Sequence, residues 1–186
     1  MKKFLCTMLT LAALLISTTA LAAYRETISE GADLGSIKRL AVALPDYYQT
    51  EVVEPNFDDF IKIIFDASKS SRLYVISYDE IAANIQRDTG VDIKALDVLE
   101  ARRIYDENIS KYADASVRVT VANNPKKVQF FFDVQSAADG NLVYILTTQS
   151  GSIGKNSKDY LKACEEFYSK FGSAIDKSLK DAKKKK

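Results

Sequence analysis

The sequence predicts an α/β (α+β) domain with a single mixed sheet of about five strands and helices packed on the sheet, in the order β-α-β-α-β-β-β-α. Two short apolar runs flank an amphipathic helix, which indicates a β-α-β unit with parallel strands. Three later segments alternate apolar and polar residues and are joined by turn residues, which indicates an antiparallel meander. A long apolar stripe at helical spacing then predicts a final helix that covers the sheet.

Residues 1–22 have the pattern of a signal peptide. Lys2 and Lys3 precede a short apolar run, and Ala20-Leu21-Ala22 has the small residues that signal peptidase requires. We therefore expect export to the periplasm or the extracellular side of a bacterium, with no stable membrane anchor after cleavage. Loss of the two lysines leaves 24 basic residues of the original 26 against 25 acidic ones, so the net charge changes from +1 to −1.

The first half of the predicted domain alternates strands and helices. Residues 23–36 are predicted as an irregular lead-in, and residues 37–181 as a single α/β domain. Ile37–Leu44 is nearly continuous in apolar residues, as in a strand buried on both faces, and Pro45 ends it. Residues 45–56 are predicted as a loop, and Asn56 is expected to cap the helix that follows. Residues 73–77 form the second apolar run.

Two helices and the meander follow. We predict a short helix over 78–86 and a longer one over about 93–112, capped by Asp92. Residues 115–121, 128–134 and 142–148 are the three meander strands, and Asp139-Gly140-Asn141 is typical of a hairpin turn. The last helix is expected from Ser157 to Asp181, and residues 182–186 form a basic tail.

Composition and motifs argue against several functions. The chain has no histidine, which removes the commonest general base and metal ligand and excludes Ser-His-Asp and Cys-His catalysis. Asp88-Thr89-Gly90 matches the aspartic protease tripeptide, but only one copy is present and the chemistry needs two. Residues 151–156 follow a strand as a phosphate-binding loop does, but lack its full glycine and hydroxyl pattern. We therefore predict no enzyme, no cofactor and no metal site, and the near-zero charge argues against nucleic acid.

The order of elements resembles a group of bacterial envelope α/β modules. The residues that carry the resemblance are the Lys38–Pro45 strand, the Arg72–Ile81 strand and helix, the Ala113-Asp114 start of the meander and the Asp139-Gly140 turn. The group includes the periplasmic domain of the curli-secretion lipoprotein and the amino-terminal domain of the Tol-Pal propeller protein. The resemblance implies a non-catalytic module for protein contacts or assembly. The lipoprotein cysteine, the pore-forming insertions and the propeller are missing, so channel activity is not implied.

We therefore expect an exported protein-interaction or assembly module of the cell envelope, with an unidentified envelope protein as partner. Its candidate interaction surfaces are the Tyr47–Tyr48 loop after the first strand, or an exposed edge or face of the sheet. One side of the meander carries an apolar group made of Phe131, Val143 and Ile145. Two alternatives stay open: a periplasmic small-ligand-binding protein, and a glycan hydrolase that uses two carboxylates.

Overall fold

The computed structural model describes residues 24–48, 55–123, 128–150 and 157–184. The predicted signal peptide, residues 1–22, and the glycine-containing segment 151–156 lie outside these residues. The strands are β1 Tyr24–Ile28, β2 Arg39–Val42, β3 Asp46–Tyr48, β4 Tyr74–Ile76, β5 Ala115–Asn123, β6 Val128–Ser136 and β7 Leu142–Ser150. The helices are α2 Phe57–Ala67, α3 Tyr78–Thr89, α4 Val98–Asn108 and α5 Ser157–Lys184, with short 3-10 turns η1 Leu34–Ser36, η2 Ser68–Ser70, η3 Ile93–Ala95 and η4 Ile109–Lys111.

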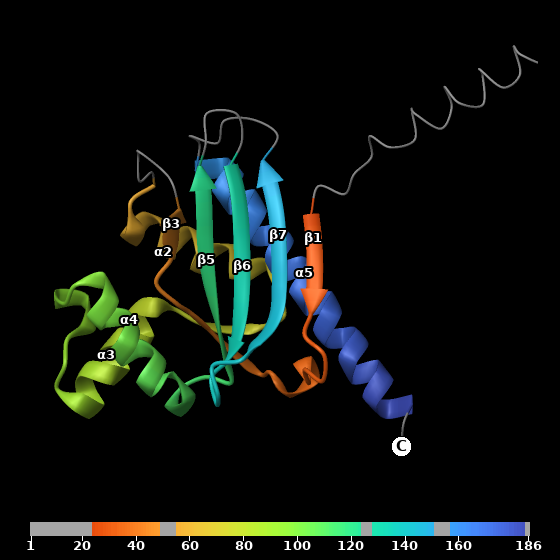
Figure 1. Ribbon diagram of the computed structural model, residues 1–186, viewed down its shortest axis with the longest axis horizontal. Helices are drawn as coiled ribbons and strands as arrows, with labels where there is room; N and C mark the ends of the chain where they lie inside the picture. Colours follow the sequence, from red (N-terminus) through yellow and green to blue (C-terminus); the bar gives the residue numbers. More distant parts are fainter. Residues whose placement is uncertain (1–23, 49–54, 124–127, 151–156, 185–186) are drawn as a thin grey trace, which may run out of the picture.

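A single mixed sheet confirms the predicted fold class. Its strand order in the described residues is β1-β7-β6-β5-β2-β4, and β3 also pairs with β5 (Figure 1). β2 and β4 are parallel, as the β-α-β pattern predicts, and β5, β6 and β7 form the predicted antiparallel meander. Within the described residues the sheet has seven strands in place of about five, because β1 and β3 were not predicted.

The two additional strands correct the predicted lead-in and the predicted loop. Residues 23–36 contain β1, which pairs with β7, so part of the predicted irregular lead-in belongs to the sheet. The Tyr24 ring is also held by Lys170 of α5, whose Nζ lies 4.0 Å from the ring centre. Residues 45–56 contain β3, which extends the parallel pairing along β5. Both strands depend on partners far along the chain, and their own residues are largely polar or lie beside a proline.

The helices begin at residues whose side chains satisfy free backbone N–H groups. The Asn56 side chain accepts a hydrogen bond from the Asp59 N–H at 2.9 Å, so the predicted start of α2 is confirmed. The predicted helix over 93–112 is wrong in its first part. Asp92 caps only η3, and Asp97 starts a new helix by accepting hydrogen bonds from the N–H groups of Leu99 and Glu100. At the chain end, α5 continues to Lys184, through most of the predicted tail over 182–186.

The main core lies between the sheet and the helices α5 and α2, which cover the same face (Figure 1). Aromatic rings dominate it. Phe132 of β6 stacks on Phe167 of α5 with ring centres 4.7 Å apart, and Tyr144 of β7 lies 4.9 Å from Phe171. A second core lies on the other face, where α3 and α4 cover β2 and β4. There the Tyr105 hydroxyl donates to the Val42 carbonyl at 3.0 Å.

Asp114 joins the start of β5 to the start of β2. The N–H groups of Lys38 and Arg39 donate to its carboxylate at 2.9 and 2.8 Å, and the Arg39 guanidinium lies 3.2 Å from it. Burial acts to raise the pKa of Asp114, but these hydrogen bonds and the Arg39 charge together lower it below 3.8. The Ala113-Asp114 pair noted in the sequence thus has a structural role.

Candidate functional site: the open face of the sheet

The strands β5, β6, β7 and β1 present a face that no described helix covers (Figure 1). Because side chains alternate along a strand, the face opposite the main core is made by every second residue of the meander. One row of this face is formed by five residues that lie side by side on β3, β5, β6, β7 and β1, each paired with the next across the sheet. These are Asp46, Thr120, Phe131, Thr147 and Arg25. We call this surface the open face.

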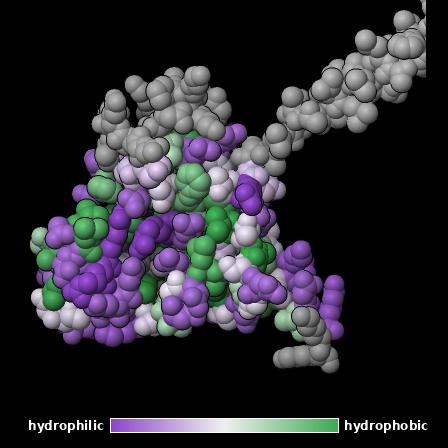
Figure 2. Space-filling view, in the orientation of Figure 1, coloured by the Kyte–Doolittle hydropathy of each residue, from purple (hydrophilic) through white to green (hydrophobic). Residues whose placement is uncertain are grey.

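Phe131 and Ile145 form the apolar centre of the open face. Phe131 pairs with Thr147, and Ile145 pairs with Asp133, so the two apolar side chains occupy adjacent rows on neighbouring strands. Both are half-buried. Figure 2 shows hydrophobic surface over the strands, hydrophilic surface at the end of α5, and a mixture of the two at the α3–α4 side. The structure therefore brings together these two of the residues predicted to form an interaction surface.

A charged group borders the apolar centre. Arg118 of β5 forms an ion pair with Asp106 of α4, with Nη2 at 3.1 and 3.2 Å from the two carboxylate oxygens. Asp133 pairs with Arg118 in the sheet register, but its carboxylate accepts no hydrogen bond from the described residues. Burial raises the pKa of Asp133 above 3.8, and the Arg118 charge opposes this shift. Asp133 is therefore a half-buried carboxylate without a close partner of its own.

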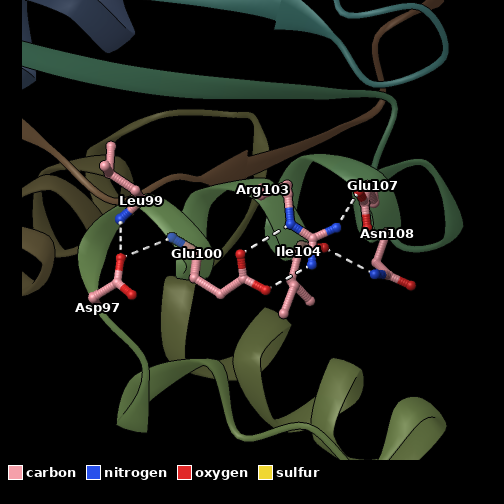
Figure 3. A network of polar contacts seen from close by, with 7 residues as sticks. All are labelled: Asp97, Leu99, Glu100, Arg103, Ile104, Glu107 and Asn108. Atoms are coloured by element: carbon pink, nitrogen blue, oxygen red, sulfur yellow. Dashed lines mark hydrogen bonds and ion pairs between the residues drawn. The ribbon is translucent and has the colours of Figure 1, made fainter.

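The wall beside the open face is α4, and charged residues fix its position. The Arg103 guanidinium lies between Glu100, at 2.7 Å, and Glu107 one turn further on (Figure 3). Arg102 reaches from α4 to β3, where it donates to the Pro45 carbonyl at 2.9 Å and pairs with Asp46 at 3.1 Å. The Arg102 contacts anchor the helix to the sheet, whereas the Arg103 ion pairs lie within α4. A hollow of about 200 Å³ lies between the Asp106–Arg118 pair and the carboxyl-terminal end of β6.

The two tyrosines of the predicted surface have different positions. Tyr47 faces the main core, with its ring 5.5 Å from Phe57, and its hydroxyl donates to the Pro55 carbonyl. Burial raises the pKa of Tyr47 strongly. Tyr48 is 58% exposed and pairs with Ala122, so it lies at a corner of the open face. One tyrosine is thus a packing residue and the other is available for contact.

Val143 is placed apart from Phe131 and Ile145. It is partly buried and packs against the main core, and its carbonyl accepts a hydrogen bond from the Ser29 N–H at 3.1 Å. The register between β6 and β7 shifts beside it, between Val134 and Gln135. A bulge of this kind interrupts the alternation from which side-chain direction is predicted. The sequence pattern alone gave no signal for the shift.

The remaining sequence motifs have structural roles in the described residues. Gly90 ends α3 with φ at 77°, a left-handed conformation that glycine adopts without strain, and Asp88 accepts a hydrogen bond from the Tyr112 hydroxyl. Cys164 is fully buried, and burial raises the pKa of its thiol. Among the described residues, no three metal-binding side chains gather in one place. No helix in the described part of the chain is both long enough and apolar enough to span a membrane.

No protein-family model matches the sequence, and no curated protein matches it. Similar solved structures include PelC from Paraburkholderia phytofirmans, with 13% identity, a TM-score of 0.49, and coverage of 80% of this chain and 96% of PelC. The LpoB C-terminal domain from Escherichia coli has 10% identity and a TM-score of 0.48, and the match covers 66% of this chain and 87% of the LpoB chain. Lipoprotein GNA1162 from Neisseria meningitidis has 13% identity and a TM-score of 0.40, and the match covers 64% of this chain and 84% of the GNA1162 chain.

Each TM-score is below 0.5 and each identity is 13% or less. The similar structures therefore carry no argument about function, which has to come from the surface of this chain.

Proposed function

We propose that the protein is an exported, non-catalytic module of the bacterial cell envelope that binds a protein partner through its open face. The observation that carries the proposal is the uncovered side of the β5-β6-β7-β1 sheet, where Phe131 and Ile145 lie beside charged residues. An apolar centre with a polar rim is the usual anatomy of a protein interface. The non-catalytic part of the proposal rests on the lack of histidine in the sequence.

Unpaired polar groups on the open face support a partner over a solvent-facing surface. In the described part of the chain, the half-buried Asp133 carboxylate accepts no hydrogen bond, and the buried Nε of Arg118 has no hydrogen-bond partner. Groups of this kind cost free energy in the isolated protein. A partner that donates a hydrogen bond to Asp133 recovers the cost of that carboxylate on binding.

A photo-crosslinking experiment tests the proposal. Benzoylphenylalanine replaces Phe131, because both side chains are aromatic and the Phe131 side chain is only partly buried. The matched control carries the same group at Glu80, an exposed position on α3. After irradiation of the native cells, we expect a protein adduct at position 131 and none at position 80.

Two outcomes would contradict the proposed function. Equal adducts at both positions would show random collision and not a specific surface. The absence of a protein adduct, together with a small molecule found by mass spectrometry of the purified protein, would favour the ligand-binding alternative.

A further inference from the structure

A groove of about 400 Å³ lies on the helix-covered side of the molecule, between α5 and the segment that joins α2 to β4. One wall is a single stripe of α5 at helical spacing. It contains Glu165, Tyr168, Ser169, Gly172, Ser173 and Asp176. The other wall comprises residues 70–74 and Lys38. The stripe extends over three turns, which is about 16 Å at 1.5 Å per residue.

Gly172 keeps the middle of this groove open. It lies inside a long helix, where glycine is less favourable than alanine. A Cβ built on Gly172 meets no atom within 4 Å, and the residue has no left-handed backbone angle. Neither packing nor backbone geometry therefore requires glycine here. Its effect is to let another molecule approach the helix backbone closely.

Tyr168 gives a second, independent indication of an occupant. Its side chain lines the groove and is 1% exposed, and its hydroxyl has no hydrogen-bond partner in the described residues. Buried hydroxyl groups without a partner are uncommon in folded proteins. A polar atom of a bound molecule can supply that partner.

The charges in the groove indicate what binds there. Glu165 and Asp176, at the two ends of the stripe, make no hydrogen bond or ion pair through their carboxylates with a described residue. Arg72 on the opposite wall is likewise unpaired within the described part of the chain. Separate acidic and basic walls match a chain that carries both charges, as a peptide does, better than an anionic polymer.

The groove also borders the end of the sheet. Its lining includes Tyr74, the first residue of β4, and among the described strands β4 pairs only with β2. The outer backbone N–H and C=O groups of such an edge can pair with an extended peptide. At about 3.3 Å per residue, five extended residues match the length of the α5 stripe.

We propose that this groove binds an extended peptide segment of about five residues, presented by a protein partner, with basic side chains against Glu165 and Asp176. The inference rests on the proposed function, because it specifies the chemistry of a partner. The groove lies on the opposite side of the sheet from the open face, so the two contacts can be tested separately.

The test uses a library of random twelve-residue peptides displayed on phage and selected on the purified protein. We expect the selected peptides to be enriched in pairs of lysine or arginine four to six positions apart. Their binding should weaken at least tenfold in Gly172→Val, which fills the groove, and in Glu165→Lys with Asp176→Lys. Asp181→Lys is the matched control on the same helix and should leave binding unchanged.

Stability measurements separate blocked binding from misfolding. Gly172→Val and Gly172→Ala should retain the helical circular dichroism of the parent, and Gly172→Ala should unfold at a higher temperature. Selected peptides that bind Gly172→Val as tightly as the parent would overturn the groove proposal, as would a selection that enriches no basic peptide. Neither result affects the cross-link at position 131, so failure of the groove is distinguishable from failure of the proposed function.

Discussion

The two faces of the same three strands differ sharply in what they carry. On the covered face, β6 and β7 place Phe130, Phe132 and Tyr144 against α5, and all three are fully buried. On the open face, the intervening residues are mainly threonine, glutamine and charged residues, with Phe131 and Ile145 as the apolar exceptions. Strand alternation lets one segment serve two purposes. The covered face provides stability, and the open face is free for contact.

The largest expected effect tests the covered face. Phe167→Ala removes a fully buried ring that stacks on Phe132 and Phe171, and it should lower the free energy of unfolding by about 3–5 kcal/mol. Phe131→Ala on the open face should cost only about 1 kcal/mol, because the ring is only partly buried before the change. Urea denaturation followed by circular dichroism measures both. Equal losses would show that the open face is part of the core after all.

A smaller effect is expected from Asp114, which has the hydrogen bonds that Asp133 lacks. Asp114→Asn should lower the free energy of unfolding by about 1 kcal/mol at neutral pH, since hydrogen bonds to a charged, partly exposed group are weakened. Because folding lowers the pKa of Asp114, its stabilising charge is present above pH 3.8 and is lost as the pH falls through the folded value. The difference between parent and variant should therefore shrink in acid, as measured by thermal unfolding from pH 7 to pH 2.5.

The smallest effect should have the opposite sign. Folding raises the pKa of Asp133, so its charge destabilises the protein once the pH exceeds the folded value. Asp133→Asn should increase the free energy of unfolding by about 0.5 kcal/mol at pH 7. The gain should disappear below pH 3.8, where the aspartate is protonated in both states. Thermal unfolding at pH 7 and pH 3 checks this, and a loss of stability at pH 7 would mean that Asp133 has a stabilising partner in the folded protein.

Much of the fold could be predicted, because local signals specify it. The Asn56 cap, the apolar stripe of α2 and the Asp139-Gly140 turn all act over a few residues, and the structure confirms them, with Gly140 at φ 71°. β1 and β3 could not be predicted, because their pairing depends on β7 and β5 and not on their own composition. The division of the helix at Asp97 was missed because Asp92 offered an equally good cap.

The candidate site was predictable only in part. Alternation correctly placed Phe131 and Ile145 on the side opposite Phe130 and Phe132. The side-chain directions of Tyr47 and Val143 could not be predicted, because tertiary packing sets them. Packing decides which side of β3 faces the core and where the β6–β7 register shifts. The groove beside Gly172 carried a weak signal, a helix-interior glycine, whose meaning required the empty space around it to be seen.

The pairing of β1 with β7 has a consequence for how the chain folds. The Ser29 hydroxyl, just after β1, donates to the Leu142 carbonyl across 113 positions of sequence. Contacts between such distant residues form late, because the entropy of closing the intervening chain must be lost first. The outer strand of the sheet should therefore be the last element to dock. The amino-terminal segment of the domain therefore stays unpaired until β7 is in place.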